Sequence, residues 1–157
     1  MPTTDQKLEL LFEEREILRL INLFDQTTNQ RDIKLFSTLW TEDAVWEIGE
    51  PRPSRANGRK DIVSMLVKVY EPLEFFFRTT QTPIIEFHAN GHSATGRAGT
   101  MELAKLSDGN SYANVAFYAD EYRKVKGKWL FSGRHYEYIW VETEVPLPGT
   151  YVARRKD

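Results

Sequence analysis

Four long runs of strand-like sequence fill the second half of the chain, and they limit the possible folds more than any other feature. The runs cover about residues 75–88, 93–105, 112–125 and 128–142, and they are rich in aromatic and β-branched residues. Short segments with good hairpin-turn chemistry separate them: Ala89-Asn90-Gly91, Ser107-Asp108-Gly109-Asn110 and Lys126-Gly127. Strands joined by such short turns pair antiparallel, so the sequence predicts a four-stranded meander.

The first half of the chain has helical spacing instead. Apolar residues recur three and four positions apart between about Asp5 and Asn29, which predicts a long amphipathic helix. Asp32 is placed to cap a second short helix, and residues 61–69 predict a third that stops before Pro72. Residues 44–48 alternate as a strand, and residues 49–58 have the composition of a lid-like loop. Helices followed by strands indicate an α+β fold, with helices covering one face of a sheet.

Size and composition narrow the classes of protein. The chain has 157 residues, which fits one domain over residues 1–144 with an irregular tail at 145–157. No apolar run approaches the ~20 residues of a membrane span, and the acidic N-terminus does not resemble a secretory signal. The chain has no cysteine, so the cytoplasm is the expected compartment. Basic residues are spread along the chain at a net charge of -2, which disfavours nucleic-acid binding.

Three stretches of sequence carry a resemblance to a known family. They are residues 29–32 leading into 39–46 (LWTEDAVW), residues 57–62 (NGRKDI), and residues 118–122 (YADEY) running into 126–131 (KGKWLF). Their order and spacing, from about Glu13 to Glu142, resemble the SnoaL-like branch of the nuclear transport factor 2-like superfamily. The resemblance implies a cone-shaped half-barrel of curved antiparallel sheet, covered by the three helices and enclosing an apolar cavity. It also implies a homodimer or homotrimer formed through the outer face of the sheet.

Members of this superfamily include steroid isomerases, polyketide cyclases, scytalone dehydratases, small subunits of ring-hydroxylating dioxygenases, and proteins without catalytic activity. The fold therefore implies a pocket for a hydrophobic small molecule, polycyclic or polyketide-like, and does not fix the reaction. No cofactor is expected.

The dehydratases of this superfamily place an acidic residue at the end of the first long helix and histidines on the first two long strands. Aligned with that pattern, this sequence has Asn29 at the helix position and Thr82 and Ala98 at the strand positions. None of these side chains exchanges a proton near neutral pH. We therefore expect Asn29, Thr82 and Ala98 to contact the substrate, without the acid–base machinery of the dehydratases.

Asp120 is the best remaining candidate for a general base. Alternation puts Tyr118, Asp120 and Tyr122 on one face of a strand, and a carboxylate in an apolar cavity has a raised pKa. The alternative is a structural ion pair between Asp120 and Arg134. Tyr118, on the same face, is expected to contact the substrate.

Arg134 and His135 complete the catalytic candidates. Within a cavity, Arg134 would hold a carboxylate or an enolate through paired donors. His135 is an acid–base candidate with a surface or interface role as the alternative, and alternation points the two side chains to opposite faces.

Trp46 is expected either to stack on a ligand or to belong to the core. Four small residues at alternate positions, Ala94, Gly96, Ala98 and Thr100, indicate either a roomy cavity or close packing. His88 and His92 flank a tight turn without a predictable third ligand, so no metal site is expected. No glycine-rich run has the spacing of a phosphate-binding loop.

The leading hypothesis is a cofactor-independent isomerase, cyclase or lyase that acts on a hydrophobic small molecule. In it, Asp120 moves a proton, Arg134 stabilises oxyanion charge and Asn29 orients the substrate. The alternatives are a non-catalytic ligand-binding domain and an accessory subunit resembling the small subunit of a dioxygenase.

Overall fold

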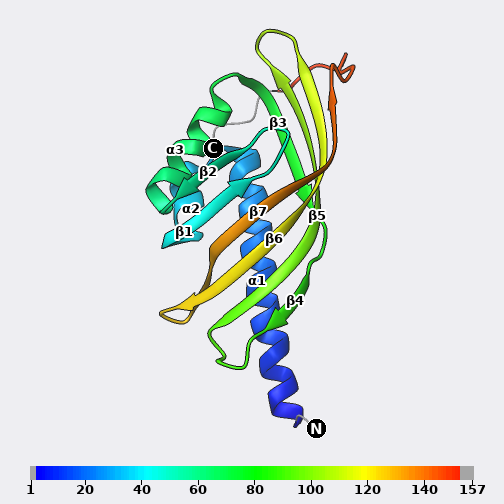
Figure 1. Cartoon of the computed structure of the whole chain (residues 1–157). Helices are drawn as coiled ribbons and strands as arrows, with labels where there is room; N and C mark the ends of the chain where they lie inside the picture. The colour runs from blue at the N-terminus through cyan, green and yellow to red at the C-terminus, as the bar shows by residue number, and fades with distance from the viewer. Residues whose placement is uncertain (1–2, 153–157) are drawn as a thin grey trace.

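Three helices and seven strands make up residues 3–152, the part of the chain that the computed structural model describes. The helices are α1 (Thr4–Gln30), α2 (Ile33–Ser37) and α3 (Arg59–Tyr70). The strands are β1 (Trp40–Ile48), β2 (Ser54–Asn57), β3 (Leu73–Thr80), β4 (Ile84–Phe87), β5 (Ser93–Leu106), β6 (Ser111–Val125) and β7 (Lys128–Thr143). Figure 1 shows α1 running along one face of a curved sheet, with α2 and α3 near one end. The predicted α+β fold is confirmed.

Local hydrogen bonds explain where the first two helices begin. At the start of α1, the Thr3 hydroxyl accepts from the Gln6 backbone N–H at 3.2 Å, and the Gln6 side chain accepts from the Thr3 N–H at 2.8 Å. The Asp32 carboxylate accepts from the Leu35 N–H at 2.9 Å, which confirms the predicted cap of α2.

The seven strands form one sheet in the order β2-β1-β7-β6-β5-β3, and β4 also pairs with β5. The predicted meander is present, because β3, β5, β6 and β7 pair antiparallel in that order. The sheet as a whole is mixed, however, since β1 lies parallel to β7. These two strands are far apart in sequence, so no turn between them fixes their relative direction.

The strands differ from the prediction in three places, the first being β1, which begins at Trp40 and not at residue 44. The segment expected to be a loop contains β2, which pairs antiparallel with β1. The run expected to be one strand over residues 75–88 is divided into β3 and β4, with residues 81–83 between them. Pro83 lies in this interruption, and a proline cannot donate a backbone hydrogen bond to a sheet.

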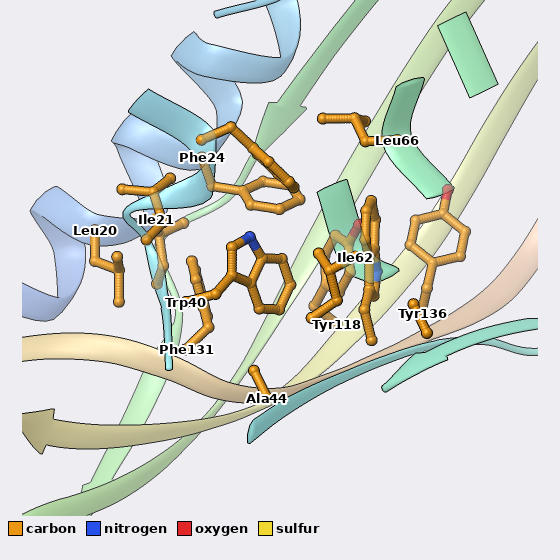
Figure 2. Close-up of a cluster of buried hydrophobic side chains, with 14 of the residues drawn as sticks. Leu20, Ile21, Phe24, Trp40, Ala44, Ile62, Leu66, Tyr118, Phe131 and Tyr136 are labelled. Atoms are coloured by element: carbon orange, nitrogen blue, oxygen red, sulfur yellow. The ribbon is translucent and has the colours of Figure 1, made fainter. Parts of the chain in front are cut away.

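An aromatic core lies between α1 and the sheet. Phe24 on α1 is at its centre, and its ring centroid lies 5.6–6.0 Å from those of five other rings: Phe36, Trp40, Trp46, Tyr118 and Phe131. Figure 2 shows Leu20 and Ile21 of α1 beside this cluster and Leu66 of α3 near Tyr136. The core thus holds α1 against the inner face of the sheet.

Among residues 3–152, no helix is both long enough and apolar enough to cross a membrane. After β7, residues 145–152 form no helix or strand. The remainder of the predicted tail, residues 153–157, lies outside the described residues.

Candidate functional site

A cavity of about 230 Å³ lies between α3, the β1–β2 segment and the inner face of the sheet. Its walls are largely aromatic: Trp46, Phe76, Tyr112, Tyr118, Tyr136 and Tyr138 line it together with aliphatic side chains of α3. Among these walls, Arg78, Glu102 and Asn114 form one group of polar side chains, and Thr28, Arg52 and Ser54 also line the cavity. The cavity therefore combines a largely aromatic lining with a cluster of polar side chains and a few separate polar residues.

The strand register brings the three polar side chains together. Arg78 on β3 pairs with Glu102 on β5, and Glu102 pairs with Asn114 on β6. Side chains of paired residues on neighbouring strands project to the same side of a sheet. The three residues therefore form a row across the inner face, although 36 positions separate the first from the last in sequence.

Ion pairs and hydrogen bonds hold this row in place. Arg78 Nη2 lies 2.9 Å from Glu102 Oε1 and donates at 2.8 Å to the Tyr118 hydroxyl, while Asn114 Nδ2 donates at 3.1 Å to Glu102 Oε2. On the side of α1, Arg78 Nε lies 3.5 Å from Asp25 Oδ1. Burial acts to lower the pKa of Arg78, but Tyr118 and the two carboxylates outweigh it and raise that pKa. Arg78 is therefore charged although it is only 3% exposed.

Four buried polar atoms of the lining residues have no hydrogen-bond partner among residues 3–152. They are the Tyr136 hydroxyl, Asn114 Oδ1, Trp46 Nε1 and Arg78 Nε, the last of which has only the ion-pair contact with Asp25. Burial raises the pKa of Tyr136, and it raises that of Tyr118 to about 12, so both hydroxyls remain protonated near neutral pH. Since a buried polar atom without a partner is costly, this set favours a ligand that carries both a donor and an acceptor.

Asp120 and Arg134 form a second buried charged group, deeper along the same face of β6 and β7. The Asp120 carboxylate accepts from Arg134 Nε at 2.7 Å and Nη2 at 3.0 Å, and the Tyr122 hydroxyl donates to it at 2.9 Å. Burial raises the pKa of Asp120, and the ion pair with Arg134 acts in the opposite direction. Asp120 thus faces inward as predicted, in the ion pair that was the alternative to its role as a base.

The Arg134 guanidinium is enclosed by aromatic rings. Its Cζ atom lies 3.7 Å from the ring centroid of Tyr118 and 4.2 Å from those of Phe24 and Phe131. Neither Arg134 nor Asp120 lines the cavity described above, whereas Tyr118 lies between that cavity and Arg134. The pair therefore contacts a wall of the cavity rather than its contents.

Of the five predicted substrate contacts, Trp46 and Tyr118 line the cavity and three others do not. Asn29 binds the backbone of Arg78 instead, with Nδ2 donating to the carbonyl and Oδ1 accepting from the N–H, both at 2.8 Å. Thr82 is exposed in the segment between β3 and β4, and Ala98 is buried in the core beside Tyr118. His135 lies on the outer face of the sheet, half exposed, with Nδ1 3.9 Å from Glu47 Oε2.

The small residues of β5 serve close packing rather than the cavity. None of Ala94, Gly96, Ala98 and Thr100 lines it. A Cβ atom on Gly96 would lie 2.9 Å from the ring of Tyr122, closer than such atoms approach in proteins. The glycine therefore leaves room for this tyrosine, which in turn hydrogen-bonds to Asp120.

His88 lies in an exposed turn with Nδ1 2.7 Å from the Ser93 hydroxyl. In residues 3–152, no group of three or more histidine, aspartate or glutamate side chains is arranged to hold a metal ion.

Sequence reasoning missed the polar row of Arg78, Glu102 and Asn114. Part of the signal was present in the alternation of the strands. Glu102 lies two residues after Thr100 and Asn114 lies four residues before Tyr118, so each shares a sheet face with a residue that the alternation had already identified. The alignment placed the inward position of the first long strand at Thr82, four residues beyond Arg78.

Comparisons with known proteins agree with this geometry. The profile of the SnoaL-like domain family matches residues 9–135. A search of curated protein sequences gives no match.

Solved structures with the same fold include the hexachlorocyclohexane dehydrochlorinase LinA type 2, with a TM-score of 0.80 and 19% identity over 94% of this chain and 97% of that one. A candidate scytalone dehydratase from Novosphingobium aromaticivorans gives a TM-score of 0.77 and 16% identity over 94% and 97% of the two chains. The beta subunit of a candidate aromatic-ring-hydroxylating dioxygenase from the same organism gives 0.68 and 13% over 82% and 90%. At these identities the structures show a shared fold, and the match of the family profile over most of the chain shows that the protein belongs to the SnoaL-like domain family.

Proposed function

We propose that this protein is a cofactor-independent lyase or isomerase that moves a proton on a small hydrophobic substrate bearing a carbonyl group. The observation that carries the proposal is the placement of Glu102 in an aromatic cavity that also contains the unpartnered hydroxyl of Tyr136. The names of two structural relatives, a dehydrochlorinase and a scytalone dehydratase, describe eliminations, which also begin with removal of a proton. The likeness supports the class of reaction and not a particular substrate.

In this proposal Glu102 is the general base. It removes a proton next to the substrate carbonyl, and the Tyr136 hydroxyl donates a hydrogen bond to the oxyanion that develops. Arg78 and Asn114 fix the Glu102 carboxylate through its two oxygens. Asn29 positions Arg78 by binding its backbone.

The structure supports a different role for Asp120 and Arg134 from the one expected from sequence. We assign them a supporting role, because Arg134 packs directly behind the ring of Tyr118 and neither residue lines the cavity. Together they would hold Tyr118 where its hydroxyl meets Arg78.

The volume of the cavity favours a smaller substrate than the polycyclic one implied by the family. A protein cavity of ~150 Å³ accommodates benzene. A cavity of about 230 Å³ therefore fits a molecule of one or two rings.

Proton exchange on a two-ring ketone tests the proposal. We expect the wild-type protein to accelerate deuterium incorporation next to the carbonyl of 2-tetralone in D₂O, measured by NMR. Glu102→Gln should reduce this acceleration about 10²-fold or more, which is the usual contribution of a general base. Glu121→Gln, which changes an exposed carboxylate on the outer face of β6, is the matched control and should retain the activity. Equal rates for Glu102→Gln and the wild type would refute the assignment.

A second candidate function is ligand binding without catalysis. The observation in its favour is that both inward carboxylates of β5 and β6, Glu102 and Asp120, are ion-paired with arginine and accept a further hydrogen bond within the protein. Binding of 2-tetralone by the wild-type protein without any acceleration of exchange would support this candidate over the first.

We also propose that the chain forms a homodimer or homotrimer through the outer face of the sheet. Exposed apolar side chains lie across paired positions of this face, with Phe77 (50% exposed) next to Leu103 (40%) and Met101 (57%) near Trp140 (48%). Sedimentation velocity should show Met101→Glu shifting the protein towards monomer, whereas Lys68→Glu on α3 should not. A wild-type monomer would refute the proposal, and a stable homo-oligomer without a larger partner would argue against the accessory-subunit alternative.

A further inference from the structure

Arg52, between β1 and β2, and Ser54, at the start of β2, are both exposed and line the cavity, so we take this end as its mouth. Arg52 lines the cavity from this segment, and its Cζ atom lies 5.3 Å from the ring centroid of Tyr112. Pro51 and Pro53 flank it, and each fixes its own backbone φ angle, so the segment has few alternative conformations. The guanidinium is therefore held at the entrance by a stiff segment and an aromatic ring.

Arg52 differs from the other arginines near the sheet in its electrostatic surroundings. Arg78 and Arg134 inside the fold, and Arg55 next along the chain, each have a carboxylate within ion-pair distance. Among residues 3–152, no carboxylate lies within 4.0 Å of the Arg52 guanidinium, although it is close enough to the ring of Tyr112 for a cation–π contact. The charge of Arg52 thus remains available to a ligand in the cavity.

The other side chains at this end add hydrogen-bond donors and no negative charge. Ser54, Tyr112 and Tyr138 line the cavity here, and each carries a hydroxyl group. The carboxylate of the cavity lining, Glu102, lies on β5 opposite Asn114, which is two residues along β6 from Tyr112. Two residues of a strand span about 7 Å. Tyr112, whose ring contacts Arg52, therefore occupies the inward position of β6 next to the polar row.

We propose that the cavity selects small aromatic carboxylates, with Arg52 binding the carboxylate at the mouth and the ring lying among the tyrosines and Trp46. The inference rests on the proposed use of this cavity for a ligand of one or two rings, and it adds the charge of that ligand. Arginine suits this role because its planar guanidinium binds a carboxylate through two parallel hydrogen bonds.

Calorimetric titration of the full chain with two matched probes tests the inference. The probes are 2-naphthoate and 2-naphthylmethanol, which share the ring system and differ in the charged group. We expect the wild-type protein to bind 2-naphthoate about tenfold more tightly, as a charge-assisted hydrogen bond allows. Arg52→Gln should abolish this preference and leave the dissociation constant of 2-naphthylmethanol within about twofold of the wild-type value.

Arg55→Gln is the matched control, because Arg55 lies three residues away, is paired with Glu47 at 2.8 Å and does not line the cavity. It should keep the wild-type preference. Equal affinity of the wild type for both probes would overturn the inference, as would an Arg52→Gln variant that weakens both probes alike or an Arg55→Gln variant that loses the preference too. Failure of both probes to bind folded wild-type protein would instead refute the proposed use of the cavity itself.

Discussion

Removing Arg134 should strongly destabilise the fold. In Arg134→Leu, the Asp120 carboxylate stays buried and keeps only the hydrogen bond from Tyr122. Loss of one partner of a buried ion pair typically costs about 3–5 kcal/mol, because the other charge is left uncompensated. Both side chains are fully buried, so screening by solvent does not reduce this value. Since small domains have unfolding free energies of about 5–15 kcal/mol, the variant should lose a large share of its stability.

Urea unfolding followed by tryptophan fluorescence would measure this loss, and its dependence on pH identifies the cause. In the folded wild type, burial raises the pKa of Asp120 and Arg134 opposes that rise. Without Arg134 the pKa of Asp120 must rise further above its unfolded value. A carboxyl with a raised folded pKa stabilises the fold fully below its unfolded pKa and loses that contribution as pH rises through the folded value. The deficit of Arg134→Leu should therefore be smaller in acid than at neutral pH.

The double variant Asp120→Leu/Arg134→Leu is the control, because it removes both charges together. Replacing a buried ion pair with apolar side chains is often close to neutral, so this variant should regain most of the lost stability and show no such dependence on pH. A loss below about 1 kcal/mol in Arg134→Leu, or a loss that does not change with pH, would refute the reasoning.

Two further predictions concern single contacts. Asn29→Ala removes both hydrogen bonds to the backbone of Arg78. We expect the unfolding free energy in urea to fall by about 1–3 kcal/mol and proton exchange on 2-tetralone to become slower. An unchanged unfolding midpoint would contradict this role. The hydrogen bond from Lys124 lowers the pKa of Glu13, so this contact stabilises the fold above the unfolded pKa and is lost as pH falls through the lower folded value. Glu13→Gln should therefore be less stable than the wild type near neutral pH and approach it in acid, and thermal unfolding across that range would show whether the two curves converge.

Most of the fold was predictable because its signals are local. Turn chemistry at Lys126-Gly127 and alternation along β6 identified the meander, and the side chain of Asp32 identified the start of α2. The pairing of β1 with β7 was not predictable, since it depends on contacts between distant parts of the chain. β2 was missed because a strand of four residues next to two prolines does not differ from a loop in composition.

The candidate site was predictable only in part. Alternation correctly placed Tyr118 and Asp120 on the inner face, but it gives no information about which inward residues surround open space. That depends on α3, which covers one end of the sheet and leaves the cavity beside Glu102 rather than beside Asp120. Arg78 was missed because its environment is assembled from three separate segments, with Asp25 from α1 and Glu102 from β5.

The bonding of Arg78 has a consequence for redesign of this protein. One guanidinium is ion-paired with Asp25 and Glu102 and lies 4.8 Å from the ring centroid of Phe24. Replacing Arg78 with a neutral side chain would leave two carboxylates, Asp25 and Glu102, without their cation. Libraries that vary one cavity position at a time should therefore lose folded protein before they yield new activities. Productive variants are expected where positions 25, 78 and 102 change together and keep their summed charge.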